Sequence, residues 1–224
     1  MRCCLVAPKL VTITHAVNYW PFTLEQIMID NRERFEHTLA RFDTANAQDP
    51  NLDEGQPKEL LYGQRMSDMI GRFAPDASEA AQLAVRAQHI QRWTVPRNSY
   101  PMTKEGYHAW RTGLYTFHAD TAGELMREAG YDDSMIERVK KAVGKRGIKV
   151  NPESQLLEDI ANLVFIEHYL LAFANSKPDY DEAKWLEIIR RTWGKMSKNA
   201  QAYALSGKIN LPESLVPLIT KAIS

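Results

Sequence analysis

Residues 151–173 are the segment that most constrains how this chain can fold. They open with Asn151-Pro152, a helix N-cap followed by proline at the first helical position. The helix predicted to follow is apolar on nearly all of its sides. Because such a helix is stable only when other segments surround it, we expect it to be central and buried.

Helical periodicity and capping signals predict further helices before and after this central one. Their expected ranges are 23–48, 58–73, 79–93, 104–129, 133–143, 181–196, 198–205 and 212–223. No stretch alternates in the manner of a β-strand, no repeat period occurs, and no linker is long enough to separate two domains. The predicted fold class is therefore all-α, with one compact multi-helix domain over residues 23–224.

Charge and cysteine content narrow the partners and the compartment. Lys+Arg and Asp+Glu both number 28, so no overall charge draws the chain to nucleic acid or to a membrane. The two cysteines, Cys3 and Cys4, are adjacent and offer neither a disulfide framework nor a zinc-ligand spacing. No apolar run approaches the ~20 residues of a membrane span. We expect a cytoplasmic protein, because this cysteine usage suits a reducing compartment.

Residues 1–22 are expected to be an extension outside the domain. They contain Arg2 and Lys9 but no acidic residue, and Pro8 and Lys9 interrupt their apolar stretch. The pattern fits a weak organelle presequence or an upstream start codon that lengthens the natural protein, and it fits a secretion signal least well.

One face of the helix predicted over 79–93 carries the first candidate site. Gln82, Arg86, His89 and Trp93 follow each other at i, i+4, i+7 and i+11, and so fall on one stripe. A solvent-facing stripe would favour Lys and Glu and would rarely combine an indole, an imidazole and a guanidinium. We therefore expect this stripe to form the wall of a polar pocket.

A polar cluster lies on the central helix. Its members share one side of the first two turns and are Gln155, Glu158, Asp159 and Asn162. Buried carboxylates are costly unless a cation or a metal compensates them, so the cluster indicates a site. The structural alternative is that acidic residues near a helix N-terminus are favoured by the helix dipole and by access to solvent.

Two sets of residues are candidates for the cationic partner of these acids. One is Arg86 with His89, and the other is Arg111 with His118, seven residues apart on the next helix. Asp120 points about 200° away from His118, at ~100° per residue, and is therefore discounted as a co-ligand. A lone histidine at the edge of a core is more often structural, but two histidines facing one acidic cluster favour a site.

Basic and aromatic residues are concentrated in one short span. This span contains Arg86, Arg92, Trp93, Arg97, Tyr100, Tyr107, Trp110 and Arg111. Guanidinium groups bind phosphate or carboxylate through two hydrogen bonds, and aromatic rings can stack on a base. The span indicates a phosphate-bearing ligand, with packing of a loop as the structural alternative. A second basic run, over residues 140–149, is expected to be a solvated face.

Several short motifs resemble an uncharacterised domain-of-unknown-function family. They are Glu59-Leu-Leu-Tyr-Gly-Gln-Arg-Met66, Arg86-Ala-Gln-His-Ile-Gln-Arg-Trp93, Phe117-His-Ala119, Leu157-Glu-Asp159, Leu163-Val-Phe165 and Lys195-Met-Ser197. The resemblance extends from Leu24 or so to the C-terminus. Some members of that family carry a glutamyl-tRNA synthetase label, which this chain does not support because it has no nucleotide-binding α/β pattern.

The order His, His, Asp on successive helices is also similar to the HD-type metal-dependent phosphohydrolases, a superfamily of all-α enzymes. In that resemblance His89 takes the place of the histidine in a His-Asp doublet, His118 that of a later histidine and Asp159 that of the final aspartate. Ile90 stands where the doublet has its aspartate. The resemblance implies an HD-like helical arrangement and a divalent metal (Mn, Co, Fe or Zn) held by His89, His118 and Asp159.

Two functions follow as expectations. The first is a phosphohydrolase that acts on a small phosphorylated compound or nucleotide, in which the metal lowers the pKa of a bound water. Its catalytic residues would be Glu158 and Arg86, and its substrate-binding residues Gln88, Arg92, Trp93, Arg97 and Arg111. The alternative is a metal-free binding module for an anionic ligand, a nucleotide or an RNA segment, without turnover. In a purely structural scaffold, the same polar groups would only pair with one another.

Overall fold

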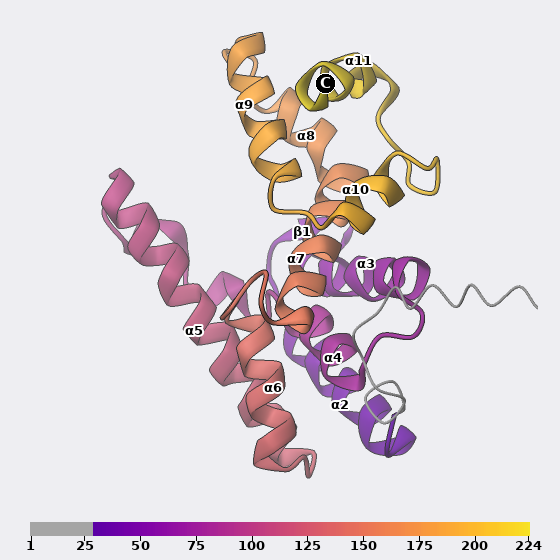
Figure 1. The fold of residues 1–224 in the computed structure, drawn as a ribbon. Coiled ribbons are helices and arrows are strands. Elements are labelled where there is room, and N and C mark those ends of the chain that lie inside the picture. Colours follow the sequence, from indigo (N-terminus) through magenta and orange to yellow (C-terminus); the bar gives the residue numbers. More distant parts are fainter. Residues whose placement is uncertain (1–28) are drawn as a thin grey trace, which may run out of the picture.

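A computed structural model describes residues 29–224 of the chain. Figure 1 shows that this part is built from helices, which confirms the all-α prediction. The helices are α2 (Arg32–Asn46), α3 (Lys58–Phe73), α4 (Glu79–Ala87), α5 (Lys104–Glu128), α6 (Asp133–Val143), α7 (Pro152–Val164), α8 (Leu170–Asn175), α9 (Glu182–Trp193), α10 (Lys198–Ala204) and α11 (Val216–Ile223). Three-residue turns of 3-10 helix occupy Arg92–Thr94, Arg97–Ser99 and Glu213–Leu215.

Two very short strands join α2 to α3. β1 (Leu52–Asp53) and β2 (Gln56–Pro57) pair antiparallel, with Leu52 opposite Pro57. Gly55 has a φ of +77°, the left-handed conformation that a tight hairpin turn requires and that glycine adopts without strain. The hairpin leads directly into α3 and leaves the fold class unchanged.

Helix α7 lies at the centre of the molecule (Figure 1) and packs against α3, α4, α6 and α10. Its apolar side chains that are at most 2% exposed are Leu156, Leu157, Ile160, Leu163 and Val164. Around it, α5 packs along α6, while α8 to α11 gather beyond the C-terminal end of α7. The expected central position of this helix is confirmed.

The sequence predicted one helix over 152–173, and the chain is helical throughout this range. Its α-helical hydrogen bonding is interrupted, however, which the sequence had not predicted. After Val164 the chain forms a π-helical turn, Phe165–Tyr169, before α8 begins. A π turn inserts an extra residue into the helix and changes the direction of the side chains that follow. Phe165 and Tyr169 thereby come to line a cavity described below.

Helix α4 ends at Ala87, before the predicted end at residue 93. Gln91 then adopts a left-handed backbone conformation with a φ of 51°. Its backbone N–H donates to the Asn46 side-chain oxygen at 2.9 Å. Because the chain leaves the helix here, the stripe Gln82, Arg86, His89 and Trp93 does not form one continuous wall, and that prediction was wrong.

The start of α2 differs from the expected helix over 23–48. Its N-cap is Asn31, whose side-chain oxygen accepts the Arg34 N–H at 2.9 Å. The capping signal expected at residue 23 and the extension expected over 1–22 lie outside the described residues.

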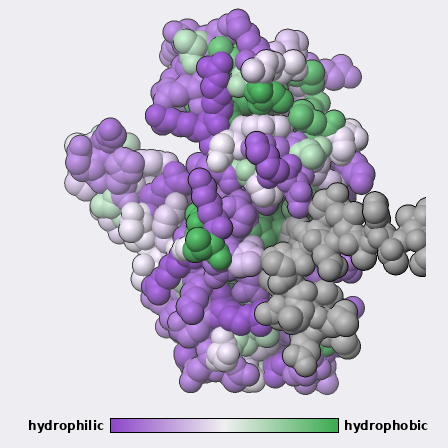
Figure 2. Space-filling view, in the orientation of Figure 1, coloured by the Kyte–Doolittle hydropathy of each residue, from purple (hydrophilic) through white to green (hydrophobic). Residues whose placement is uncertain are grey.

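The surface shown in Figure 2 is largely hydrophilic. Apolar patches lie over the loop between α6 and α7, where Val150 is 86% exposed, and on the C-terminal helices. Within residues 29–224, no helix has both the length and the apolar character to cross a membrane.

Candidate functional site

A cavity of about 150 Å³ lies where the segment after α4 meets α5 and the end of α6. We call it the cationic cavity. Its polar lining residues are Gln88, His89, Arg92, Arg111, His118 and Lys145, and its aromatic and apolar ones are Tyr107, Trp110, Leu114, Tyr115 and Val143. The structure thus brings together five predicted site residues, namely Gln88, His89, Arg92, Arg111 and His118. Two aromatic residues of the basic and aromatic span, Tyr107 and Trp110, join them.

His118 is a neutral, almost fully buried side chain of α5. Its Nδ1 lies 2.8 Å from the backbone oxygen of Ile90, while its Nε2 is buried without a hydrogen-bond partner among the described residues. Burial, assisted by the neighbouring His89, lowers the pKa of His118 to about 3. The ring is therefore uncharged at neutral pH.

His89 is held between three polar or aromatic neighbours. Its ring stacks on Tyr62 with centroids 4.3 Å apart, and its Nδ1 lies 3.3 Å from the Glu59 carboxylate. On the cavity side, an Arg92 nitrogen lies 3.1 Å from His89 Nε2. Burial and the Arg92 charge lower the pKa of His89 well below its usual value, and burial raises that of Glu59. The rings of His89 and His118 are 5.8 Å apart.

Two arginines of the cationic cavity are oriented by aromatic rings instead of carboxylates. The Arg92 guanidinium carbon lies 5.2 Å from the centre of the Trp110 ring. The Arg111 Nε donates to the Tyr115 hydroxyl at 2.7 Å. In residues 29–224, neither arginine forms a salt bridge with a carboxylate, in contrast to Arg86 and Arg65.

Residues 140–149 were expected to form a solvated basic face, and for Lys145 this expectation was wrong. Its side chain is only 12% exposed, and its Nζ lies 2.5 Å from Glu158 Oε2. A left-handed backbone conformation at Lys145, with a φ of 53°, turns it inward after α6. Burial raises the pKa of Glu158, but the Lys145 charge and hydrogen bond outweigh this and leave it below its usual value. Lys145 lines the cationic cavity, whereas Glu158 is not among its lining residues and contacts Lys145 from behind.

Asp159 has a structural environment of its own. Its Oδ1 accepts hydrogen bonds from the Ser197 backbone N–H at 2.7 Å and from the Gln155 side chain at 3.0 Å, and so ties α7 to the start of α10. Within the described part of the chain, no group of three His, Cys, Asp or Glu side chains could hold a metal ion. The proposed ligand set of His89, His118 and Asp159 is therefore not assembled here, and metal binding stays a prediction.

The remaining predicted site residues lie elsewhere. Arg86 forms a two-pronged pair with Asp43, at 2.7 and 2.6 Å, and links α4 to α2. Arg97 donates to the backbone oxygens of Tyr100 and Pro101, at 3.1 and 2.7 Å, and holds the loop before α5. Trp93 is not part of the cavity lining. Arg97 therefore packs its own loop, which was the structural alternative to a role in phosphate binding.

A second cavity, of about 320 Å³, adjoins the first. We call it the aromatic cavity. Its lining residues are Lys58, Glu59, Tyr62, His89, Arg92, Ala161, Phe165 and Tyr169. Sequence reasoning assigned no functional role to Glu59, Tyr62 or Tyr169. The available signal was the placing of Glu59 and Tyr62 at i and i+3 on the first turn of a well-predicted helix.

Comparison with known protein families matches residues 36–219 to a family described as Domain of unknown function (DUF4202). No curated protein and no solved structure was found to match the chain. The matched range covers most of the chain and agrees with the resemblance to an uncharacterised family that the motifs had indicated. The chain therefore belongs to the DUF4202 family.

Proposed function

We propose that this protein binds a small phosphate-bearing anion in the cationic cavity, without turnover. The observation that carries the proposal is that Arg92 and Arg111 both line this cavity and lack a carboxylate partner in residues 29–224. A guanidinium at a concave, partly buried site is costly unless an anion compensates it, and its planar array of donors matches phosphate oxygens.

The neighbouring groups support an anionic ligand. The rings of His89 and His118 are neutral at neutral pH, so the positive charge of this cavity comes from its arginine and lysine side chains. Lys145 lines the same cavity and adds positive charge, although Glu158 balances it. The Tyr115 hydroxyl fixes the Arg111 guanidinium before a ligand arrives, which lowers the entropy cost of binding.

Isothermal titration with inorganic phosphate and pyrophosphate tests the proposal. We expect Arg92→Gln and Arg111→Gln each to weaken binding by about tenfold or more, the effect of losing one charged hydrogen bond. Arg191→Gln is the matched control, because the Arg191 side chain is 75% exposed on α9. Absence of binding, or unchanged affinity in the Arg111 variant, would overturn the proposal.

A metal-dependent phosphohydrolase is the second candidate function. The observation in its favour is that His118 Nε2 has no partner among the described residues and lies beside His89. The test is a panel of phosphate monoesters with Mn, Co, Fe or Zn, together with elemental analysis of the untagged protein. Metal-dependent turnover that is lost in His118→Asn would support it, whereas no turnover with any of the four metals would reject it.

A further inference from the structure

The cationic cavity is large enough for only part of a typical ligand. Its volume of about 150 Å³ is below the ~300–1,000 Å³ of most small-molecule sites. The aromatic cavity, of about 320 Å³, adjoins it. His89 and Arg92 line both cavities, so a single pair of side chains forms their shared wall.

The lining of the aromatic cavity differs in chemistry from that of the cationic one. Tyr62, Phe165 and Tyr169 contribute aromatic rings to this lining, and Ala161 contributes only a methyl group. The rings of Tyr62 and Tyr169 have centroids 6.0 Å apart and are tilted by 47°, so neither covers the face of the other. Such a surface fits a flat ring that can stack or pack edge-on.

The same cavity has one acidic group at its wall. Glu59 is buried in the first turn of α3, and its Oε2 lies 3.3 Å from His89 Nδ1. A carboxyl group in this position can exchange hydrogen bonds with the polar edge of a ring. The cavity is therefore suited to a heteroaromatic ring more than to a plain hydrocarbon.

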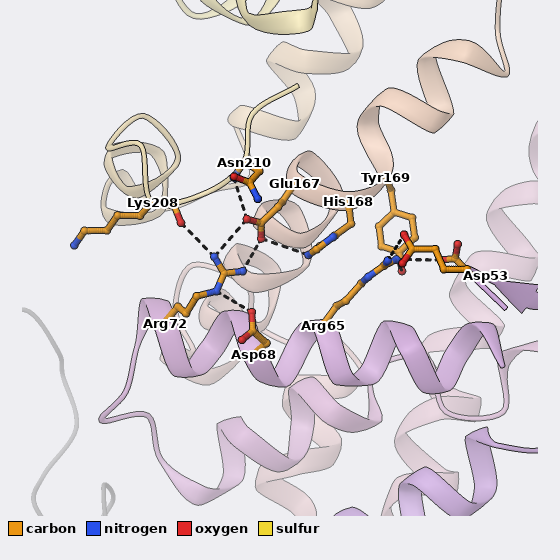
Figure 3. A network of polar contacts seen from close by, with 10 residues as sticks. Asp53, Arg65, Asp68, Arg72, Glu167, His168, Tyr169, Lys208 and Asn210 are labelled. Carbon is orange, nitrogen blue, oxygen red and sulfur yellow. Dashed lines mark hydrogen bonds and ion pairs between the residues drawn. The ribbon is translucent and has the colours of Figure 1, made fainter. Parts of the chain in front are cut away.

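Figure 3 shows how the π-helical turn that carries two of these rings is held against α3. Arg65 donates to the Tyr169 hydroxyl at 3.0 Å and also pairs with Asp53 at 3.0 Å. Further along, Arg72 pairs with Glu167 at 2.6 Å. A π turn within a helix is often found at a functional site, and here its surroundings give it a defined position.

We propose that the two cavities form one divided site for a phosphorylated compound that carries a heteroaromatic ring. The phosphoryl group lies against Arg92 and Arg111, and the ring lies among Tyr62, Phe165 and Tyr169, with the His89 and Arg92 side chains between them. This inference rests on the proposed function, because it takes the anion-binding role of the cationic cavity as its starting point.

The test compares three probes by isothermal titration: inorganic phosphate, ribose 5-phosphate and adenosine 5′-monophosphate. We expect adenosine 5′-monophosphate to bind about tenfold or more tightly than ribose 5-phosphate, the effect of one stacked ring. Ala161→Phe fills the aromatic cavity and should remove this advantage while phosphate binding is kept. Ala172→Phe, at an exposed position of α8, is the matched control and should keep it.

A second variant covers the case in which Ala161→Phe does not fold, as judged by circular dichroism. Phe165→Leu keeps an apolar side chain and removes the ring, so it should also abolish the preference for adenosine 5′-monophosphate. If the wild-type protein binds phosphate but shows no preference between the two esters, or if folded variants keep the preference, the divided site is rejected and the proposed function stands. If phosphate itself does not bind, both are rejected.

Discussion

The Nδ1 atom of His118 lies 2.8 Å from the carbonyl oxygen of Ile90. Because a carbonyl oxygen can only accept, Nδ1 carries the ring proton, and Nε2 keeps its lone pair. Ile90 is completely buried and belongs to the segment that follows α4. The contact therefore joins α5 to that segment and stabilises the corner at which the cationic cavity forms.

Acid should destabilise the protein through His118. Its folded-state pKa of about 3 is below its ordinary value, so the stabilisation is complete above pH 6.5 and is lost as the pH falls toward 3. We expect His118→Asn, whose amide can still donate to Ile90, to reduce the loss of unfolding free energy between pH 7 and 5 by on the order of 2 kcal/mol. Urea denaturation at both pH values measures it, and equal pH dependence in the two proteins would contradict the assignment.

Lys145 should be required for stability because Glu158 is buried beside it. Removing the charge in Lys145→Met leaves a carboxylate that is 6% exposed. Among the described residues, its remaining partners are Lys195 at 3.9 Å and the Asn162 amide at 3.4 Å. We expect a loss of about 3 kcal/mol in urea denaturation, partly recovered by adding Glu158→Gln. Lys140→Met is the control, since its pair with Asp120 is at the surface and should contribute less than about 1 kcal/mol.

Arg86 should be important for stability and not for ligand binding. Arg86→Lys loses the two-pronged pair with Asp43 that connects α4 to α2. We expect a loss of about 1–2 kcal/mol in unfolding free energy, since one ammonium cannot replace the guanidinium fork. Titration with phosphate should give the wild-type affinity. A large loss of phosphate affinity in a folded Arg86→Lys protein would contradict this prediction and indicate that Arg86 takes part in binding.

Glu167 should hold the π-helical turn in place. Its side chain is 4% exposed and accepts hydrogen bonds from Arg72 and from the Asn210 backbone N–H, the latter at 2.9 Å. Glu167→Gln should lower the unfolding free energy by about 1–3 kcal/mol and speed amide exchange in the Phe165–Tyr169 turn. Glu187→Gln, on the exposed side of α9, should change neither measurement.

Stability should fall in acid through Glu167 as well. Burial raises the pKa of Glu167, but its hydrogen bonds to Arg72 and Asn210 outweigh this and lower it below its usual value. Its stabilisation is therefore present above the ordinary glutamate pKa and disappears as the pH falls below it.

The helices that were predicted most accurately are those with clear local signals. The predicted bounds of α3 and α6 agree with Lys58–Phe73 and Asp133–Val143. The side chain of Asp132 caps α6 by accepting a hydrogen bond from the Met135 backbone N–H. The two residues are three positions apart, so the local sequence is sufficient to specify this contact. The end of α4 was missed because a distant residue, Asn46, stabilises the left-handed turn at Gln91.

The sequence predicted which types of side chain form the candidate site, but it identified only some of the residues that line it. Arg92 and Arg111 were identified as members of a basic and aromatic span. His89 was identified from its helical stripe, and His118 as a second histidine expected to face the acidic cluster. Lys145 was placed at the surface, since its basic neighbours in the sequence give no sign that Glu158 lies within 2.5 Å. Asp159 was chosen as a ligand, yet its neighbour in space is the backbone of Ser197.

By itself the sequence determined the all-α class, the central position of α7 and the presence of guanidinium and imidazole groups near one another in the chain. These properties follow from periodicity and capping, which act over a few residues. Only the tertiary structure decided that α4 stops at Ala87, that a π turn directs Phe165 and Tyr169 into a cavity, and that Lys145 turns inward. Each of these depends on contacts between residues far apart in the chain, whose free energy overrides local preference.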